Sequence, residues 1–177
     1  ADQLISLVKR KKNLVSALGI DISQEMIHQG QKKLIDLDLT HKISLCKADA
    51  LDIPLDAESV ECVTMSFGLR NVVDLQKCLD ETFRVLTKGG RVIILELSRP
   101  QNRIVRAGHK WYLKHLVPFV GGLVTKKRYA YRYLQETIDA FVPPSHIVSA
   151  LEKAGFKGAY CQPLSQGIVS IYVGDKP

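Results

Sequence analysis

The chain alternates between short apolar runs and stretches in which apolar residues recur every three or four positions. Short apolar runs are typical of buried strands, and the longer periodicity is typical of amphipathic helices. The predicted strands cover residues 14–22, 43–48, 60–67, 91–97, 159–163 and 168–173, and the predicted helices cover residues 4–8, 23–37, 73–86 and 145–154. This alternation predicts an α/β fold with a doubly wound, mostly parallel sheet and a C-terminal antiparallel hairpin.

Two of these elements predict which side chains face inward. The helix at 23–37 begins at Ser23, a residue type that favours helix N-caps. We expect its buried face to contain apolar side chains at helical spacing, namely Met26, Ile27, Leu34 and Leu37. The strand at 91–97 is apolar almost throughout, which is typical of a strand covered by helices on both faces.

Length and composition bound the class of protein. The chain has 177 residues, of which 46% are hydrophobic and 24% charged, and this favours a single globular domain over residues 1–177. No apolar run approaches the roughly 20 residues that span a bilayer. The four cysteines are widely spaced, so neither a disulfide nor a metal site is predicted. We expect Cys46 and Cys62 to be buried, reduced thiols of a cytoplasmic protein.

Residues 99–134 carry the whole excess of positive charge. They hold nine of the 25 lysines and arginines and no acidic residue, whereas the rest of the chain has 16 basic for 18 acidic residues. A helical wheel places Arg103, Arg106, Lys110 and Lys114 on one side, opposite aromatic and aliphatic residues. This pattern favours a basic amphipathic lid or membrane-facing insertion, and a helix packed on the sheet is the alternative. Nucleic acid is not an expected partner, because the aromatic residues form no stacking platform.

Two acidic residues end predicted strands. Asp21 either stabilises the N-terminus of the next helix or binds ribose hydroxyls, and Asp49 is either a turn residue or a ligand group. In nucleotide-binding folds a ribose-binding acid follows a glycine-rich turn by about 20 residues. Counting back from Asp21 reaches Ala1 without such a turn. We therefore expect the natural protein to extend N-terminally, with its first strand and glycine loop absent from this chain.

A second group of polar residues follows the next two strands. Arg70 and Asn71 come after the strand at 60–67, and Glu96 closes the strand at 91–97. Ligands bind beyond the carboxyl ends of the strands in open α/β sheets. The alternatives are a surface salt bridge for Arg70, a helix cap for Asn71 and a loop-ordering role for Glu96.

Several strings resemble one family, the UbiE-type C-methyltransferases of ubiquinone and menaquinone biosynthesis. The most specific are residues 67–72 (Phe-Gly-Leu-Arg-Asn-Val) and residues 131–138 (Tyr-Arg-Tyr-Leu-x-Glu-Thr-Ile). Residues 84–90 (Arg-Val-Leu-x-x-Gly-Gly), 96–98 (Glu-Leu-Ser) and 154–156 (Ala-Gly-Phe) also match. One departure is the Thr-Lys before the Gly-Gly pair, where the family usually has Lys-Pro.

The resemblance implies a Rossmann-like domain that uses S-adenosyl-L-methionine as cofactor. It implies that Asp21 binds the ribose hydroxyls, that Asp49 and the Ala50 backbone contact the adenine, and that Ser66 lies beside the cofactor. The implied reaction is methylation of a ring carbon in a demethylated menaquinol or ubiquinol precursor.

For that reaction the implied catalytic residues are Arg70 and Asn71. A cation near the phenol oxygen stabilises the forming phenolate, and Asn71 would orient the hydroxyl. Arginine does not act as a free proton acceptor, because its pKa exceeds about 12. The base is left open among His109, His115, Tyr131, Tyr133 and a water molecule.

The polyprenyl tail of such a substrate implies an enzyme peripheral to the inner face of the membrane. Residues 99–134 would cover the quinol ring and rest on anionic lipid, and a homodimer or a quinone-pathway complex is a further possible partner. Two other functions stay open. One is a methyltransferase of the same fold that acts on another small molecule or on RNA, and the other is a non-catalytic scaffold of a quinone-pathway complex.

Overall fold

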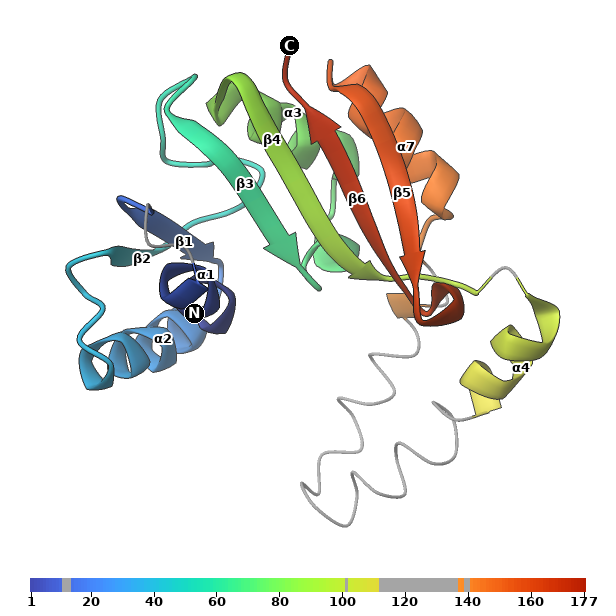
Figure 1. Ribbon diagram of the computed structural model, residues 1–177, viewed down its shortest axis with the longest axis horizontal. Coiled ribbons are helices and arrows are strands. Elements are labelled where there is room, and N and C mark those ends of the chain that lie inside the picture. Colours follow the sequence, from blue (N-terminus) through green and yellow to red (C-terminus); the bar gives the residue numbers. More distant parts are fainter. Residues whose placement is uncertain (11–13, 101, 112–136, 139–140) are drawn as a thin grey trace. The chain divides into compact units, whose positions relative to one another are not determined.

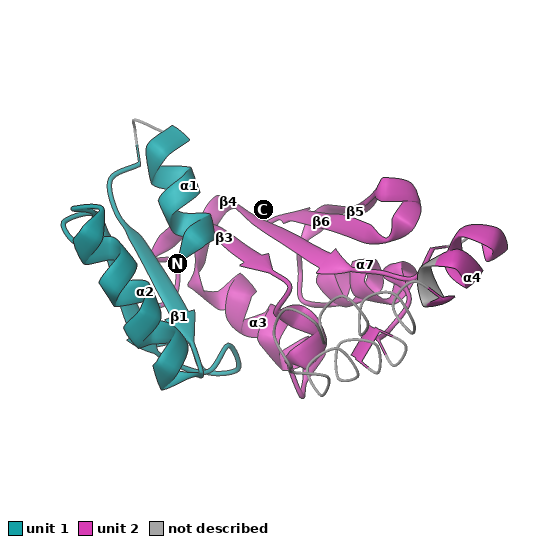
Figure 2. Ribbon diagram, turned by 90° about the horizontal axis from the view of Figure 1, so that it is seen from below, with its two compact units in different colours: residues 1–56 teal, residues 57–177 magenta. Residues whose placement is uncertain are grey.

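The computed structural model describes residues 1–10, 14–100, 102–111, 137–138 and 141–177 (Figure 1). By their contacts these residues form two compact units, residues 1–56 and residues 57–177 (Figure 2). One unit contains a two-stranded sheet and the other a four-stranded sheet. The predicted α/β class, with parallel strands and a C-terminal antiparallel hairpin, is confirmed. The expectation of a single domain over residues 1–177 stays a prediction.

The unit of residues 1–56 combines two helices with a pair of parallel strands. Its elements are α1 (Asp2–Arg10), β1 (Ala17–Asp21), α2 (Gln24–Asp36) and β2 (Ile43–Lys47). β1 and β2 are parallel and in register from Ala17 beside Ile43 to Asp21 beside Lys47. The core of this unit is a small cluster of Ile5, Val8, Leu34 and Ile43. All four elements were predicted, with bounds that differ by a few residues.

The N-cap of α2 is confirmed, whereas its predicted buried face is only half right. Ser23 Oγ accepts a hydrogen bond from the Met26 backbone N–H at 3.3 Å. Ile27 and Leu34 are buried, as predicted. Met26 is 51% exposed and Leu37 is 44% exposed. Met26 lies one position away from the inward stripe, and Leu37 already stands at the C-cap, where the backbone has left the helix.

The unit of residues 57–177 contains a mixed sheet of four strands in the order β3-β4-β6-β5. β3 and β4 are parallel, and β6 is antiparallel to both β4 and β5. The strands are β3 (Val60–Ser66), β4 (Leu86–Leu97), β5 (Lys157–Leu164) and β6 (Val169–Asp175). The helical elements are η1 (Leu69–Asn71), α3 (Leu75–Val85), α4 (Arg103–Trp111), α7 (Pro144–Lys153) and η3 (Ser165–Gly167).

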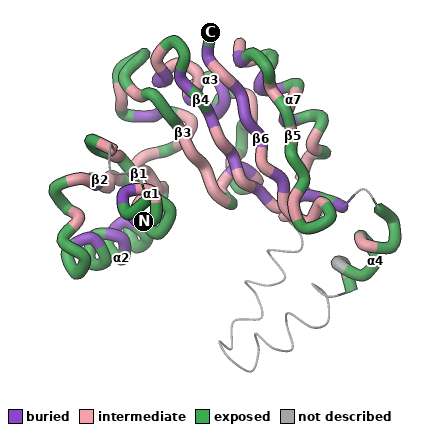
Figure 3. Tube along the Cα trace, in the orientation of Figure 1, coloured by how far each residue is buried: buried purple, intermediate pink, exposed green. Residues whose placement is uncertain are grey.

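Two helices, α3 and α7, lie on the same face of this sheet in both views (Figures 1 and 2). On that side of β4, Val92, Ile94 and Glu96 are buried, and burial runs along β4 and β6 (Figure 3). On the other side, Ile93 and Leu95 are only half-buried. The prediction that helices bury both faces of this strand is therefore not met within the described residues.

The Gly-Gly pair of the sequence forms an irregularity in β4 and does not simply end the preceding helix. Leu86 pairs with Val60 and Arg91 with Cys62, so residues 87–90 bulge out of the ladder. A Cβ on Gly90 would lie 2.8 Å from the Thr87 carbonyl oxygen and 3.0 Å from that of Glu61. Backbone groups cannot yield as side chains do, so this position requires glycine.

The cysteines are less buried than predicted. Cys78, on α3, is fully buried, Cys46 is half-buried and Cys62 is exposed. The assignment of Cys62 to the core was wrong because β3 places it on the sheet face that α3 and α7 do not cover. Within the described ranges, no helix has the length and apolar content needed to cross a bilayer.

Most of the basic segment lies outside the described residues. This includes residues 112–136 and, with them, the candidate bases His115, Tyr131 and Tyr133, and the side chain of His109 is not described either. The described part is α4, whose first turn is capped by Asn102. Its Oδ1 accepts hydrogen bonds from the backbone N–H groups of Ile104 at 2.8 Å and Val105 at 3.3 Å.

Candidate functional site

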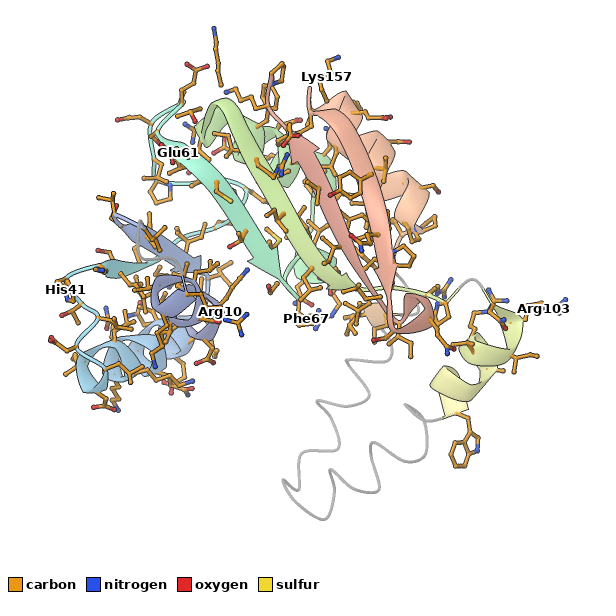
Figure 4. The ribbon with its side chains drawn as sticks, viewed as in Figure 1. Arg10, His41, Glu61, Phe67, Arg103 and Lys157 are labelled. Atoms are coloured by element: carbon orange, nitrogen blue, oxygen red, sulfur yellow. The ribbon has the colours of Figure 1, made fainter. Side chains whose placement is uncertain are left out.

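A tight backbone turn follows β3 and presents the two predicted catalytic residues. Phe67 is the first residue of the turn and adopts a left-handed conformation, with φ of 56°. Its N–H donates to the Leu95 carbonyl of β4 at 2.8 Å, which holds the turn against the neighbouring strand. Figure 4 shows Phe67 at the tip of β3. A left-handed conformation is rare for a bulky residue, and such strain often accompanies functional sites.

Arg70 forms a buried ion pair with Glu96, not the surface salt bridge considered from the sequence. The Glu96 side chain is fully buried, and the Arg70 side chain is 12% exposed. Arg70 Nη1 donates to Glu96 Oε1 at 2.7 Å, and the Arg70 backbone N–H donates to Glu96 Oε2 at 3.1 Å. The Leu97 backbone N–H, which donates to Oε1 at 2.8 Å, is the third donor to this carboxylate. A carboxylate can be buried at this depth because charged and polar donors satisfy both of its oxygens.

The remaining bonds of Arg70 are unevenly distributed over its guanidinium group. Nη1 also donates to the Phe67 carbonyl at 2.6 Å. Nε is buried and has no hydrogen-bond partner among the residues that the structure describes. The fold thus binds the guanidinium through Nη1, whereas none of the described residues accepts a hydrogen bond from Nε.

Asn71 is exposed and lies in η1, directly after Arg70. It does not cap the following helix, so that alternative was wrong. The N-cap of α3 is Asp74, whose Oδ1 accepts a hydrogen bond from the Lys77 backbone N–H at 3.0 Å. Two apolar side chains flank this turn and face outward: Phe67 is 42% and Val73 is 91% exposed.

Ser66 and Ser98 differ in their surroundings. Ser66 ends β3, is half-buried and pairs in register with Leu95. Ser98 is buried, and its Oγ lies 2.9 Å from the Gly167 carbonyl and 2.8 Å from Ser170 Oγ. Ser98 therefore ties the end of β4 to the turn between β5 and β6.

Three of the four predicted cofactor-binding residues lie within residues 1–56, just at or after the carboxyl ends of β1 and β2. Asp21 ends β1 and is half-buried, and its Oδ1 accepts a hydrogen bond from the Ser23 backbone N–H at 2.8 Å. Asp49 follows β2 and is exposed, and its Oδ1 accepts from the Leu51 backbone N–H at 2.9 Å. Ala50 is half-buried beside it. In both carboxylates this hydrogen bond engages Oδ1, which leaves acceptor capacity on Oδ2 for hydroxyl or amino donors of a ligand.

Sequence reasoning underestimated Glu96 and missed the Phe67 carbonyl. Glu96 had a readable signal, since it is the one acidic residue in an apolar strand, and a buried charge requires a partner. The Phe67 carbonyl had none, because its role depends on a backbone conformation that phenylalanine rarely adopts.

Comparison with known proteins shows which protein family this chain resembles. A model of the ubiE/COQ5 methyltransferase family matches residues 1–176. A demethylmenaquinone methyltransferase of Clavibacter sepedonicus is 41% identical over 90% of this chain and 64% of its own length. One of Porphyromonas gingivalis is 33% identical over 99% of this chain and 71% of its own length. The chain thus spans about two thirds of these relatives.

Solved structures agree on the fold. An S-adenosylmethionine-dependent methyltransferase from Aquifex aeolicus matches with a TM-score of 0.64 and 18% identity, over 97% of this chain and 74% of the other. The [4+2]-cyclase SpnF matches with a TM-score of 0.73 and 14% identity, over 99% of this chain and 72% of the other. Because proteins of different chemistry share it, the fold alone does not define the reaction.

Proposed function

Because the chain belongs to the ubiE/COQ5 methyltransferase family, we propose that the whole protein methylates a ring carbon of a demethylated menaquinol or ubiquinol precursor. The names of its relatives support this substrate class, since they include demethylmenaquinone methyltransferases and a ubiquinone/menaquinone biosynthesis C-methyltransferase. The observation that carries the proposal is the Arg70–Glu96 pair, which fixes a guanidinium beyond the carboxyl ends of β3 and β4.

S-adenosyl-L-methionine is the cofactor that family membership implies, and it supplies the methyl group. The donor set of this chain fits its adenosine part. Asp21 retains an oxygen for ribose hydroxyls, and Asp49 with the Ala50 backbone suits the adenine amino group and ring. Ser66, with a hydroxyl at the end of β3, is the fourth proposed cofactor contact.

Arg70 and Asn71 are the proposed catalytic residues. A ring carbon of a quinol becomes nucleophilic as the adjacent phenol loses its proton, and a guanidinium beside that oxygen stabilises the negative charge. Asn71 is exposed in the same turn and would orient the hydroxyl. Phe67 and Val73, both outward-facing, would contact the apolar parts of the substrate.

The cofactor site is tested by calorimetric titration of S-adenosyl-L-methionine into the natural full-length protein. Asp21→Asn keeps an oxygen for the Ser23 N–H but loses the charge that strengthens bonds to the ribose. A charge-assisted hydrogen bond contributes about 1.5–3 kcal/mol, so we expect binding to weaken about 10- to 100-fold. Asp36→Asn, at the exposed end of α2, is the matched control. Equal affinities of the two variants would contradict the assignment of Asp21.

We also propose that residues 99–134 contact an anionic membrane from which the prenyl tail enters. Support comes from α4, where Ile104 is 82% and Trp111 is 61% exposed on the same helix as two exposed arginines. Figure 4 shows the Arg103 side chain extending away from this helix.

Vesicle flotation tests this association. Each basic residue near an anionic surface contributes about 1 kcal/mol, so Arg103→Glu with Arg106→Glu should reduce binding to anionic vesicles at least tenfold. Lys153→Glu, on α7, should leave binding unchanged. Equal binding to zwitterionic vesicles would refute the electrostatic part of the proposal.

A further inference from the structure

We propose that Glu96 is a positioning residue that, together with the Phe67 carbonyl, holds Arg70 by Nη1 and so reserves the Nε and Nη2 side of the guanidinium for an acceptor oxygen of the substrate. This inference rests on the proposed function, because it assigns a task to a residue proposed to be catalytic.

The first support is the placement of the bonds. A guanidinium carries five N–H donors. Both side-chain hydrogen bonds of Arg70 start at Nη1, at 2.7 Å to Glu96 Oε1 and 2.6 Å to the Phe67 carbonyl. Within the described part of the chain, Nε is buried without a partner and Nη2 makes no hydrogen bond. A buried N–H without an acceptor is unfavourable, so Nε needs an acceptor from outside the described residues, and we assign that place to the substrate oxygen.

The second support is that the Nη1 end of the guanidinium is held by several hydrogen bonds. Glu96 receives donors from the Arg70 side chain, the Arg70 backbone and the Leu97 backbone, so it fixes both η1 and the guanidinium to the end of β4. Phe67 keeps a left-handed conformation that directs its carbonyl to Nη1. Both restraints act on Arg70 before any ligand binds, which is what preorganisation requires.

Only arginine among the cationic side chains can give some of its N–H donors to the fold and keep others for the substrate. A lysine at this position would keep the charge and the pair with Glu96. Its single ammonium would be engaged by Glu96 and the Phe67 carbonyl, and it has no second edge to present. We therefore expect Arg70→Lys to lose activity almost as completely as Arg70→Ala. If charge alone stabilises the phenolate, Arg70→Lys would retain most of its turnover, and that result would overturn the inference.

The role of Glu96 is tested with Glu96→Gln. All three neighbours of the carboxylate are donors, so a glutamine NH₂ group must face at least one of them and the restraint on Arg70 weakens. We expect kcat to fall on the order of 10²-fold, as for a misplaced catalytic group, with the affinity for S-adenosyl-L-methionine unchanged. Glu81→Gln, which removes the partner of Arg84 on α3, is the control and should change kcat less than about twofold.

A double-mutant cycle separates positioning from general structure. If Glu96 acts through Arg70, Glu96→Gln should change single-turnover rates by less than about twofold when Arg70 is already alanine. The same loss in both backgrounds would show a structural role and overturn the inference.

A readout without turnover keeps this inference distinguishable from the proposed function. Nitrogen-15 NMR of the Arg70 guanidinium should show separate, slowly exchanging Nη signals in the wild type and averaged signals in Glu96→Gln. Unchanged signals in Glu96→Gln would refute positioning whatever the enzyme does. Conversely, a wild type that holds Arg70 but never methylates a demethylated quinol would refute the proposed function alone.

Discussion

Lys176 is a buried cation beside the beginning of β4, away from Glu96 near the end of that strand, and replacing it by methionine should destabilise the protein strongly. Its side chain is 9% exposed, and Nζ donates to the carbonyls of Phe83 at 2.9 Å and Leu86 at 2.7 Å. These carbonyls belong to the C-terminal end of α3, where backbone acceptors lack helical partners and a positive charge is favourable. Nζ also lies 4.7 Å from the centre of the Phe83 ring.

The magnitude follows from these contacts. An unpaired buried acceptor costs about 1–3 kcal/mol, and two would be left by Lys176→Met. The cation–π contact adds about 0.5–2 kcal/mol. Removing the ammonium also ends the desolvation cost of a buried charge, which offsets part of the loss. The pair with Glu58, at 3.5 Å and half exposed, contributes little. We expect a net loss of about 3 kcal/mol, or roughly 6–12 °C in Tm for a protein of this size class.

The assay is urea unfolding of the natural full-length protein followed by circular dichroism. Lys153→Met, an exposed lysine in the last turn of α7, is the control and should lie within about 0.5 kcal/mol of wild type. The reasoning would be refuted if Lys176→Met were as stable as this control, because its two carbonyl bonds would then contribute nothing.

Three further predictions concern the same unit of the fold. Gly90→Ala should lower the unfolding free energy by about 1–3 kcal/mol, since its Cβ would press on two backbone carbonyls. Thermal unfolding would compare it with Gly89→Ala, whose Cβ would meet no atom within 4 Å. Burial raises the pKa of Tyr172, so its contribution to stability is present below pH of about 10 and is lost as the pH rises further. Tyr172→Phe should therefore lessen the alkaline fall in unfolding free energy, and an unaltered pH profile would contradict this. Iodoacetamide should label Cys62 in the native protein and Cys78 only after unfolding, as peptide mass spectrometry would reveal.

Elements governed by local interactions were predictable from the sequence. Ser23 caps α2 as predicted, and every predicted strand and helix within the described residues is present. Cap and turn residues act on neighbours two or three positions away, and apolar periodicity reports burial directly. Where two cap-forming types compete, as Asn71 and Asp74 do, the sequence does not decide. Here Asn71 is the last residue of the 3₁₀ turn η1, and α3 begins at Leu75, which leaves the N-cap to Asp74.

Interactions between distant residues were not predictable. Arg70 meets Glu96 across 26 positions, and Lys176 meets the end of α3 across 90 or more. Such pairs depend on strand register, which one sequence without its fold does not reveal. The candidate site residues were proposed from the sequence because ligands bind beyond the carboxyl ends of parallel strands, and their roles stay predictions. The hydrogen bonds that Arg70 Nη1 makes within the fold became visible only in the structure.

The central claim is tested most directly by methyl transfer itself. The natural full-length protein would be incubated anaerobically with S-adenosyl-L-methionine carrying a labelled methyl group and a short-chain demethylmenaquinol, and fragmentation mass spectrometry would locate the label. We predict one labelled methyl on a ring carbon, and a rate that falls about 10²- to 10³-fold in Arg70→Ala, as when a transition-state donor is removed. No label on the quinol ring from a wild-type protein that binds the cofactor, or undiminished turnover by Arg70→Ala, would contradict the account.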